Sequence, residues 1–171
     1  MIPRGWQFPG WVKGQPCEAE CAKLAELSEG KLVLELGAYC GRSTISMAQF
    51  AKMVYTVDWF EGDEGVGKSW FAETFLRNVR HKNLTRKIVA LVGDIADVAR
   101  ILPFGFFDMA FIDAAHDTPS VRRDFELVRR CVRRGGVISF HDWNLESVRS
   151  AVPISQPEGV VENLSWICNT P

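Results

Sequence analysis

Short apolar runs alternate along the chain with segments in which apolar residues recur every three or four positions. Five apolar runs have the length of a strand: KLVLEL, MVYTVDW, RKIVALVG, FFDMAFID and GGVISFHD. They lack strict alternation of apolar and polar residues, which is typical of central parallel strands covered on both faces. We therefore expect parallel strands over 31–36, 53–59, 86–93, 106–113 and 135–142.

The segments between these runs have helical spacing. A short amphipathic helix is expected over 16–28, closed by Gly30. Further helices are expected over 42–52, 69–81, 94–102 and 118–134. Thr118 is the expected cap of the last helix, with Pro119 at its first position. Regular alternation of strands and helices predicts an α/β fold with a three-layer, Rossmann-like, doubly wound and mostly parallel sheet.

Length and composition indicate a single folded domain over residues 1–171. The chain is 47% hydrophobic and 24% charged, which is ordinary for a globular protein and argues against disorder. We expect an N-terminal cap segment and helix over 1–30 and a core over 31–143. A short helix and a final strand or hairpin should follow over 144–171, so the fold is expected to be shortened at its C-terminus.

Charge and cysteine content argue against several classes of partner. The net charge is -1, so no overall field attracts nucleic acid or an anionic membrane. Basic residues cluster at 122–123 and 129–134, which we interpret as the solvated face of a helix. No apolar stretch near the N-terminus suggests a secretion signal or a membrane anchor. The five cysteines contain no Cys-x-x-Cys pair, which indicates reduced thiols in a cytoplasmic protein.

The most informative candidate site follows the first expected strand. Glu35 closes that strand, and Gly37 and Gly41 bracket a tight loop before the next helix. Asp58 ends the second strand, 21 positions after Gly37. Glycines in such a loop let the backbone approach a ligand, and the carboxylate can accept hydrogen bonds from ribose hydroxyls. The spacing Gly-x-x-x-Gly differs from the dinucleotide form, so a nucleotide-type ligand of another kind is indicated.

Further residues extend this candidate site. Ser43 lies at the start of a helix, where free backbone amides would face the polar end of the ligand. Trp59 can lie against a purine ring. Asp94 can accept a hydrogen bond from the exocyclic amine of adenine while the Ile95 amide reads a ring nitrogen. Asp94 would serve equally well as a helix cap with no ligand at all.

Four ordered motifs carry a family resemblance: ELGAYCGRS, TVDWF, FFDMAFIDAAH and GGVISFHDW. With them, residues 32–143 resemble class I S-adenosylmethionine-dependent methyltransferases, in particular the small branch close to metal-dependent, catechol-type O-methyltransferases. The resemblance implies S-adenosyl-L-methionine as cofactor and a small-molecule acceptor, more readily an oxygen than a nitrogen. It implies cofactor contacts from Glu35, Gly37, Ala38, Tyr39, Gly41, Ser43, Asp58, Trp59, Asp94, Ile95 and Asp113.

Polar residues also gather after the fourth and fifth expected strands. Asp113 and His116 follow one strand, and His141 and Asp142 follow its neighbour, so these side chains should converge. By resemblance, Asp113, His141 and Asp142 fall on the metal ligands of catechol-type enzymes. An imidazole among oxygen ligands leaves Mg²⁺ and Mn²⁺ open. His116 falls where those enzymes carry a lysine base, and we expect His116 and His141 to act in catalysis; a strand end and a helix cap would explain the same residues.

A competing motif, GDEGVGKS at residues 62–69, fits the phosphate-loop pattern G-x-x-x-x-G-K-[ST]. Nucleoside triphosphate binding is therefore an alternative, as is a cofactor-binding protein without catalysis. Residues 58–61 separate the motif from its strand, which argues against a phosphate loop. We favour a glycine-rich loop that borders the active site, with Lys68 at its rim. The sequence leaves the acceptor and the formation of homo-oligomers open.

Overall fold

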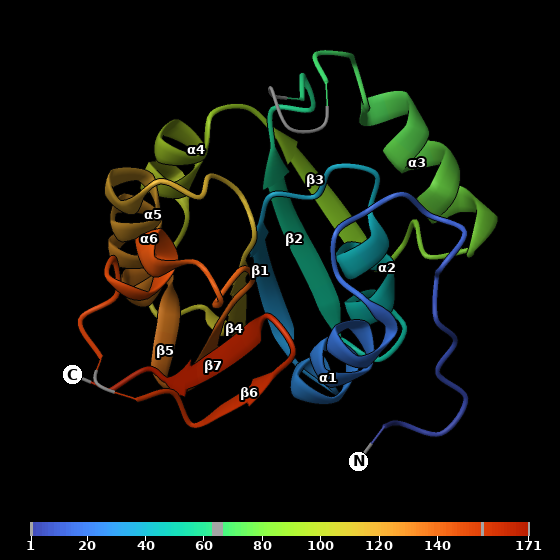
Figure 1. Cartoon of the computed structure of the whole chain (residues 1–171). Helices are drawn as coiled ribbons and strands as arrows, with labels where there is room; N and C mark the ends of the chain where they lie inside the picture. The colour runs from blue at the N-terminus through green and yellow to red at the C-terminus, as the bar shows by residue number, and fades with distance from the viewer. Residues whose placement is uncertain (1, 63–66, 155, 171) are drawn as a thin grey trace.

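A single mixed sheet forms the centre of the molecule (Figure 1). The computed structural model describes residues 2–62, 67–154 and 156–170. Within them, the strands are β1 (Leu32–Leu36), β2 (Met53–Asp58), β3 (Ile88–Val92), β4 (Phe107–Ile112), β5 (Val132–Phe140), β6 (Gly159–Val161) and β7 (Leu164–Cys168). Their order is β3-β2-β1-β4-β5-β7-β6. The five strands predicted from sequence pair in parallel, and β7 runs antiparallel to both β5 and β6.

Helices cover both faces of the sheet, which confirms the three-layer α/β prediction. In the described residues they are α1 (Glu18–Ser28), α2 (Arg42–Ala48), α3 (Ala72–His81), α4 (Ile95–Ile101), α5 (Thr118–Cys131) and α6 (Glu146–Arg149). Figure 1 shows α4, α5 and α6 on one side of the sheet and α1, α2 and α3 on the other. Among these helices, none is long and apolar enough to cross a membrane.

Strand β1 illustrates why the apolar runs do not alternate. Leu34 packs in a buried apolar cluster with Phe125 of α5. Its neighbour Val33 points to the opposite face and packs with Met47 of α2. Both faces of the strand therefore meet apolar helices, so both sets of side chains must be apolar.

The start of α5 differs from the prediction by one residue. The cap is Asp117, whose Oδ1 accepts a hydrogen bond of 3.0 Å from the Ser120 amide. Thr118, the predicted cap, instead donates its hydroxyl to the Ser147 carbonyl at 2.9 Å. Both residue types can cap a helix. The sequence alone could not show that Ser147 lies close enough to engage Thr118.

The end of α5 lies three residues earlier than predicted. Residues 132–134 begin β5 and do not extend the helix. The Asn169 side chain donates hydrogen bonds to the carbonyls of Val132 and Arg133, in place of a further helical turn. The Arg133 guanidinium donates to Asp108 of β4 at 2.7 Å. Contacts from distant parts of the chain therefore override the local helical pattern.

Candidate active site

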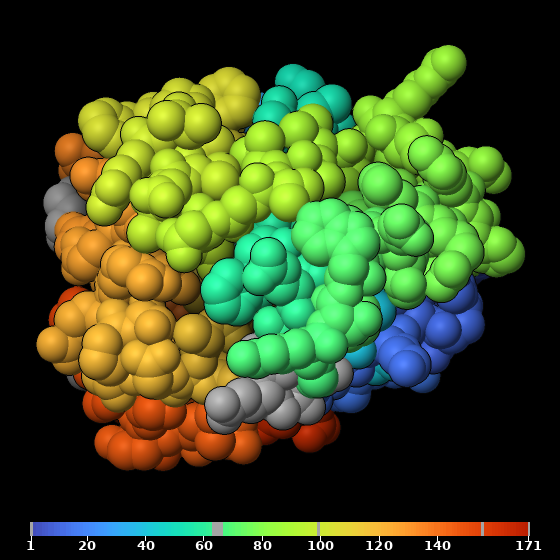
Figure 2. All heavy atoms as spheres, turned by 90° about the horizontal axis from the view of Figure 1, so that it is seen from above, coloured from blue at the N-terminus to red at the C-terminus, as the bar shows by residue number. Residues whose placement is uncertain are grey.

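A cavity of about 570 Å³ opens where the carboxyl ends of β1, β2, β3 and β4 meet, a size typical of small-molecule sites. Figure 2, seen from above, shows the segment after β2 between α3 on one side and α4 and α5 on the other. Nine of the predicted cofactor residues line the cavity in the described structure: Gly37, Ala38, Tyr39, Ser43, Asp58, Trp59, Asp94, Ile95 and Asp113. The other two, Glu35 and Gly41, are described but lie behind its wall.

Gly37 allows the loop after β1 to pass against the end of β4. Its φ of +87° lies in the left-handed region, and an added Cβ would stand 2.0 Å from the Asp113 carbonyl oxygen. The Gly37 amide also donates to the Val57 carbonyl at 2.9 Å. A side chain at this position would force β1 and β4 apart, so the glycine sets the floor of the cavity.

Asp58 holds the same loop in place. Its Oδ2 accepts hydrogen bonds from the amides of Ala38 and Tyr39, at 2.6 and 2.8 Å. Its Oδ1 accepts from the Phe60 amide at 2.6 Å. A carboxylate oxygen can accept two hydrogen bonds, so Oδ1 keeps one position for a further donor. The carboxylate predicted to bind ribose is therefore also the fixed point of the cavity wall.

Glu35 anchors the first turn of α2 from beneath. Its carboxylate accepts hydrogen bonds from the hydroxyls of Ser43, at 2.6 Å, and Thr44. Glu35 is fully buried, and burial raises its pKa to about 7 although the two hydroxyls act in the opposite direction. The predicted direct contact of Glu35 with the cofactor does not fit this geometry. Glu35 positions Ser43, and Ser43 lines the cavity.

Gly41 also takes a structural place, at the start of α2. It is the helix cap, with a φ of +92°. An added Cβ would meet the ring of Phe75 at 3.0 Å. Gly41 therefore allows close packing of the loop against α3, and its contact with a cofactor stays a prediction.

Asp94 caps a helix and also lies at the cavity, and its contact with adenine stays a prediction. Its Oδ1 accepts a hydrogen bond of 2.8 Å from the Ala96 amide, and so caps α4. The residue also lines the cavity beside Ile95. Trp59 lines the cavity as well and is 52% exposed.

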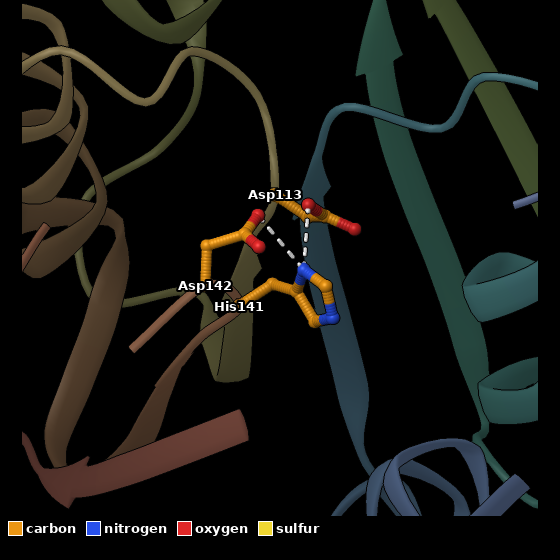
Figure 3. Close-up of side chains that lie close together, drawn as sticks. All are labelled: Asp113, His141 and Asp142. Atoms are coloured by element: carbon orange, nitrogen blue, oxygen red, sulfur yellow. Dashed lines mark hydrogen bonds and ion pairs between the residues drawn. The ribbon is translucent and has the colours of Figure 1, made fainter. Parts of the chain in front are cut away.

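The polar residues after β4 and β5 converge as predicted (Figure 3). The Nδ1 atom of His141 lies 2.9 Å from Asp142 Oδ2 and 3.4 Å from Asp113 Oδ1. One ligand atom from each residue lies within 4.8 Å of the others, which is compatible with a shared metal ion. His116 Nε2 lies 2.9 Å from Asp142 Oδ2, and His116 lines the cavity.

A third acid, absent from every sequence motif, completes this cluster. Glu20 of α1 is 2% exposed, and its Oε2 lies 3.4 Å from His141 Nε2. It shares one face of α1 with Leu24 and Leu27, at spacings of four and seven. A carboxylate on an apolar helix face was the only available signal.

The carboxylates determine the charge of the cluster. Burial lowers the pKa of His141, but hydrogen bonds to Asp113, Asp142 and Glu20 outweigh burial and raise it to about 12. Burial raises the pKa of Asp142, but His116 and His141 together hold it well below its usual range. The position between the two aspartates and Nδ1 therefore requires a positive charge, either a proton or a metal cation. One nitrogen and two oxygen donors fit Mn²⁺ better than Mg²⁺.

Two cavity-lining arginines were also missed by the sequence analysis. The Arg42 guanidinium donates to the carbonyls of Val12, at 2.7 Å, and Pro16, at 3.1 Å. These bonds hold residues 14–16 against the cavity, where they form part of its wall. Arg123 was assigned to a solvated helix face, yet it also lines the cavity.

The phosphate-loop prediction falls mainly on residues 63–66, which lie outside the described residues. Helix α3 begins at Ala72, three positions after Ser69, and Lys68 is exposed. In a phosphate loop, the lysine and serine lie at the helix start, where backbone amides face the phosphates. The described flank does not have that arrangement.

Comparisons with known proteins give one family and one fold. A family model described as a methyltransferase domain matches residues 34–143. Cofactor-bound Rv0187 from MTB is 23% identical with a TM-score of 0.62, and the match covers 86% of this chain and 65% of that one. The O-methyltransferase TomG from Streptomyces achromogenes, in complex with SAM, is 19% identical with a TM-score of 0.64, covering 83% and 63%.

A third solved structure shows that the same fold occurs in a protein named for another activity. Precorrin 8w decarboxylase from Methanobacterium thermoautotrophicum is 15% identical with a TM-score of 0.63, and the match covers 98% of this chain and 99% of that one. By contrast, this chain spans less than two thirds of the length of Rv0187 and TomG. At these identities the likeness shows the fold, and the reaction has to be argued from the site.

Proposed function

We propose, because the chain belongs to the family of methyltransferase domains, that it transfers the methyl group of S-adenosyl-L-methionine to a small-molecule acceptor, preferably to an oxygen atom. One observation carries this proposal. A single cavity joins the loop held by Asp58 to the polar residues Asp113 and His116. A cofactor bound at the first end and an acceptor bound at the second would meet within it.

The cofactor would lie along the ends of β1, β2 and β3. Gly37 permits close approach of the backbone, and the remaining acceptor position of Asp58 Oδ1 suits a ribose hydroxyl. Trp59 offers a ring face to the purine, and Asp94 and Ile95 border the same part of the cavity. TomG was solved with SAM, which supports this cofactor for a chain of the same fold.

Methyl transfer requires an acceptor oxygen that is in line with the sulfonium methyl and free of its proton. The new C–O bond forms as the S–C bond breaks, and S-adenosylhomocysteine leaves. His116 would take the acceptor proton. If the proton of neutral His116 is on Nε2, where Asp142 accepts it, then Nδ1 is free to act as the base. The hydrogen bond to Asp142 raises the pKa of His116 although burial opposes the shift, which strengthens the base.

A divalent ion held by Asp113, His141 and Asp142 would bind the acceptor oxygen and favour its ionised form. The three donors lie close enough together, and their carboxylates supply the negative charge that a cation needs. Without an ion, His141 would remain an imidazolium beside three acids, Asp113, Asp142 and Glu20. A cofactor-binding protein without catalysis is the second candidate, because His141 replaces a carboxylate that the catechol-type pattern has at this position.

Titration calorimetry tests the cofactor site. S-adenosylmethionine and S-adenosylhomocysteine should both bind, and ATP and GTP should give no heat. Asp58→Ala should weaken S-adenosylhomocysteine binding about 10- to 100-fold, because it removes charged hydrogen bonds to the loop and to the ligand. Lys68→Ala should have no measurable effect. Binding of ATP that depends on Lys68 would overturn the proposal in favour of a phosphate loop.

An assay with radiolabelled cofactor and a panel of hydroxylated small molecules separates an enzyme from a binding protein. Transfer of label to any acceptor supports the enzyme. Transfer that persists in His116→Gln at the wild-type rate would remove His116 as the base.

A further inference from the structure

Glu20 contacts His141, and the proposed function assigns no role to Glu20. It lies on α1, outside residues 34–143 that match the family model. Its carboxylate nevertheless reaches His141, 121 positions away in the sequence. Both side chains are buried, at 2% and 5% exposure. A buried acid placed against a buried imidazole is costly unless the pair is well bonded.

Three partners fix the Glu20 carboxylate in place. Its Oε2 accepts a hydrogen bond of 2.6 Å from the Cys17 amide and lies 3.4 Å from His141 Nε2. Its Oε1 accepts a hydrogen bond of 2.8 Å from the Asn163 amide, in the turn between β6 and β7. The carboxylate therefore has little freedom to rotate away from the imidazole. The orientation of the imidazole ring is set by a fixed partner.

This contact decides which ring nitrogen faces the other acids. An ionised carboxylate can only accept, so Nε2 must carry the proton that points to Glu20. Nδ1 is then the ring atom that faces Asp113 and Asp142, at 3.4 and 2.9 Å. In metal sites, a second carboxylate behind a histidine typically fixes the ring and makes the ligating nitrogen more basic.

We propose that Glu20 is a positioning residue for the metal centre, which directs His141 Nδ1 toward the ion and thereby selects Mn²⁺ over Mg²⁺. The inference rests on the metal centre of the proposed function. Nitrogen ligands favour the softer ion, whereas a site with oxygen ligands alone suits Mg²⁺. Glu20 lies outside residues 34–143 that match the family model, so the family motif by itself does not predict this selection.

Calorimetric titration with Mn²⁺ and Mg²⁺ tests the inference directly. The wild-type protein should bind Mn²⁺ more tightly than Mg²⁺. Glu20→Gln should weaken Mn²⁺ binding about 10- to 100-fold, the usual cost of losing such an outer partner. Glu18→Gln, on the same helix but exposed, is the matched control and should bind like the wild type. S-adenosylhomocysteine affinity, measured on each variant, verifies that the cofactor site is intact.

A double-mutant cycle separates positioning from a merely structural role. In a His141→Asp background, no imidazole N–H remains for Glu20 to accept. Glu20→Gln should then cost no Mn²⁺ affinity, and it should raise the affinity if the two carboxylates repel each other. An equal loss in both backgrounds would show that Glu20 only holds α1 in place, and would overturn the inference.

One measurement needs no variant. In wild-type protein loaded with Zn²⁺, nitrogen-15 NMR should show His141 with a proton on Nε2 and none on Nδ1, and the reverse assignment overturns the inference. A wild-type protein that binds none of the three ions would remove the metal centre together with this inference, but it would leave cofactor binding standing. Metal binding that is insensitive to Glu20→Gln would remove the inference alone.

Discussion

Two carboxylates near the cavity, Asp58 and Glu35, have different tasks because their environments differ. Asp58 lies at the cavity wall and accepts hydrogen bonds from three backbone amides. Glu35 is sealed beneath α2 and accepts only from hydroxyls. Amides with fixed orientation compensate an ionised carboxylate more fully than hydroxyls in a dry interior do. Burial therefore makes the ionisation of Glu35 costly and raises its pKa.

Replacement of Glu35 should change how stability depends on pH. Its pKa of about 7 in the folded protein exceeds the ordinary value of 4.5, so the folded state binds the extra proton between these pH values. The contribution of Glu35 to stability then falls as the pH rises from 4.5 to 7. Glu35→Gln cannot ionise, so its stability relative to the wild type should increase over this range, by about 3 kcal/mol at most.

Denaturant unfolding of both proteins at pH 5 and pH 8 measures this effect. The free energy of unfolding of Glu35→Gln, relative to that of the wild type, should be higher at pH 8 than at pH 5. A difference between the two proteins that is the same at both pH values would show that Glu35 titrates normally in the folded state.

At the residue scale, a short motif can predict which residues lie together. Gly37 and Asp58 line the same cavity because a tight loop and a strand end determine their positions, and their contact with a cofactor stays a prediction. Glu20 and Arg42 were missed because their roles depend on partners far along the chain. No local pattern shows that α1 packs beside the end of β5.

At the scale of elements, hydrophobic periodicity located the strands and helices, and tertiary contacts set their ends. Strand β2 ends only one residue before the predicted boundary, because its apolar run pairs with β1 and β3 over nearly its whole length. Helix α5 ends three residues early because Asn169 and Asp108 bind residues that would otherwise continue it. The local sequence around such a helix end does not predict it, because the residues that determine it are distant in the chain.

The start of α5 offers a test of this argument. Asp117→Ala removes the side chain that accepts the Ser120 amide, and should lower the free energy of unfolding by about 1 kcal/mol. Glu126→Ala, on the exposed face of the same helix, is the control and should change stability by less than about 0.5 kcal/mol. Thermal or denaturant unfolding gives both values. Equal effects would mean that Asp117 does not act as the cap.

On the scale of the whole molecule, the cavity depends on segments that are distant in sequence. Residues 14–16 come from the N-terminal segment, residues 37–39 follow β1, and residues 113–116 follow β4. A ligand that contacts all three should join them into one more rigid unit. The sequence predicted the last two segments from motifs, whereas 14–16 reach the cavity through the hydrogen bonds of Arg42.

Ligand binding should accordingly stabilise the whole fold. S-adenosylhomocysteine at 100 times its dissociation constant should add about 2.7 kcal/mol to the free energy of unfolding. Hydrogen exchange should slow in 14–16 as well as in 37–39. Calorimetric melting and exchange mass spectrometry check the two effects. Protection confined to 37–39 would show that the N-terminal segment is not part of the bound wall.

The contact between Glu20 and His141 also predicts how these two positions change together in evolution. If a mutation exchanged the imidazole for an acid, two like charges would be confined in the same dry interior, and the lineage would be under pressure to neutralise position 20. Positions 20 and 141 should thus have been inherited as a pair. The residue at position 20 of α1, outside residues 34–143 that match the family model, would then vary together with the metal that the site binds.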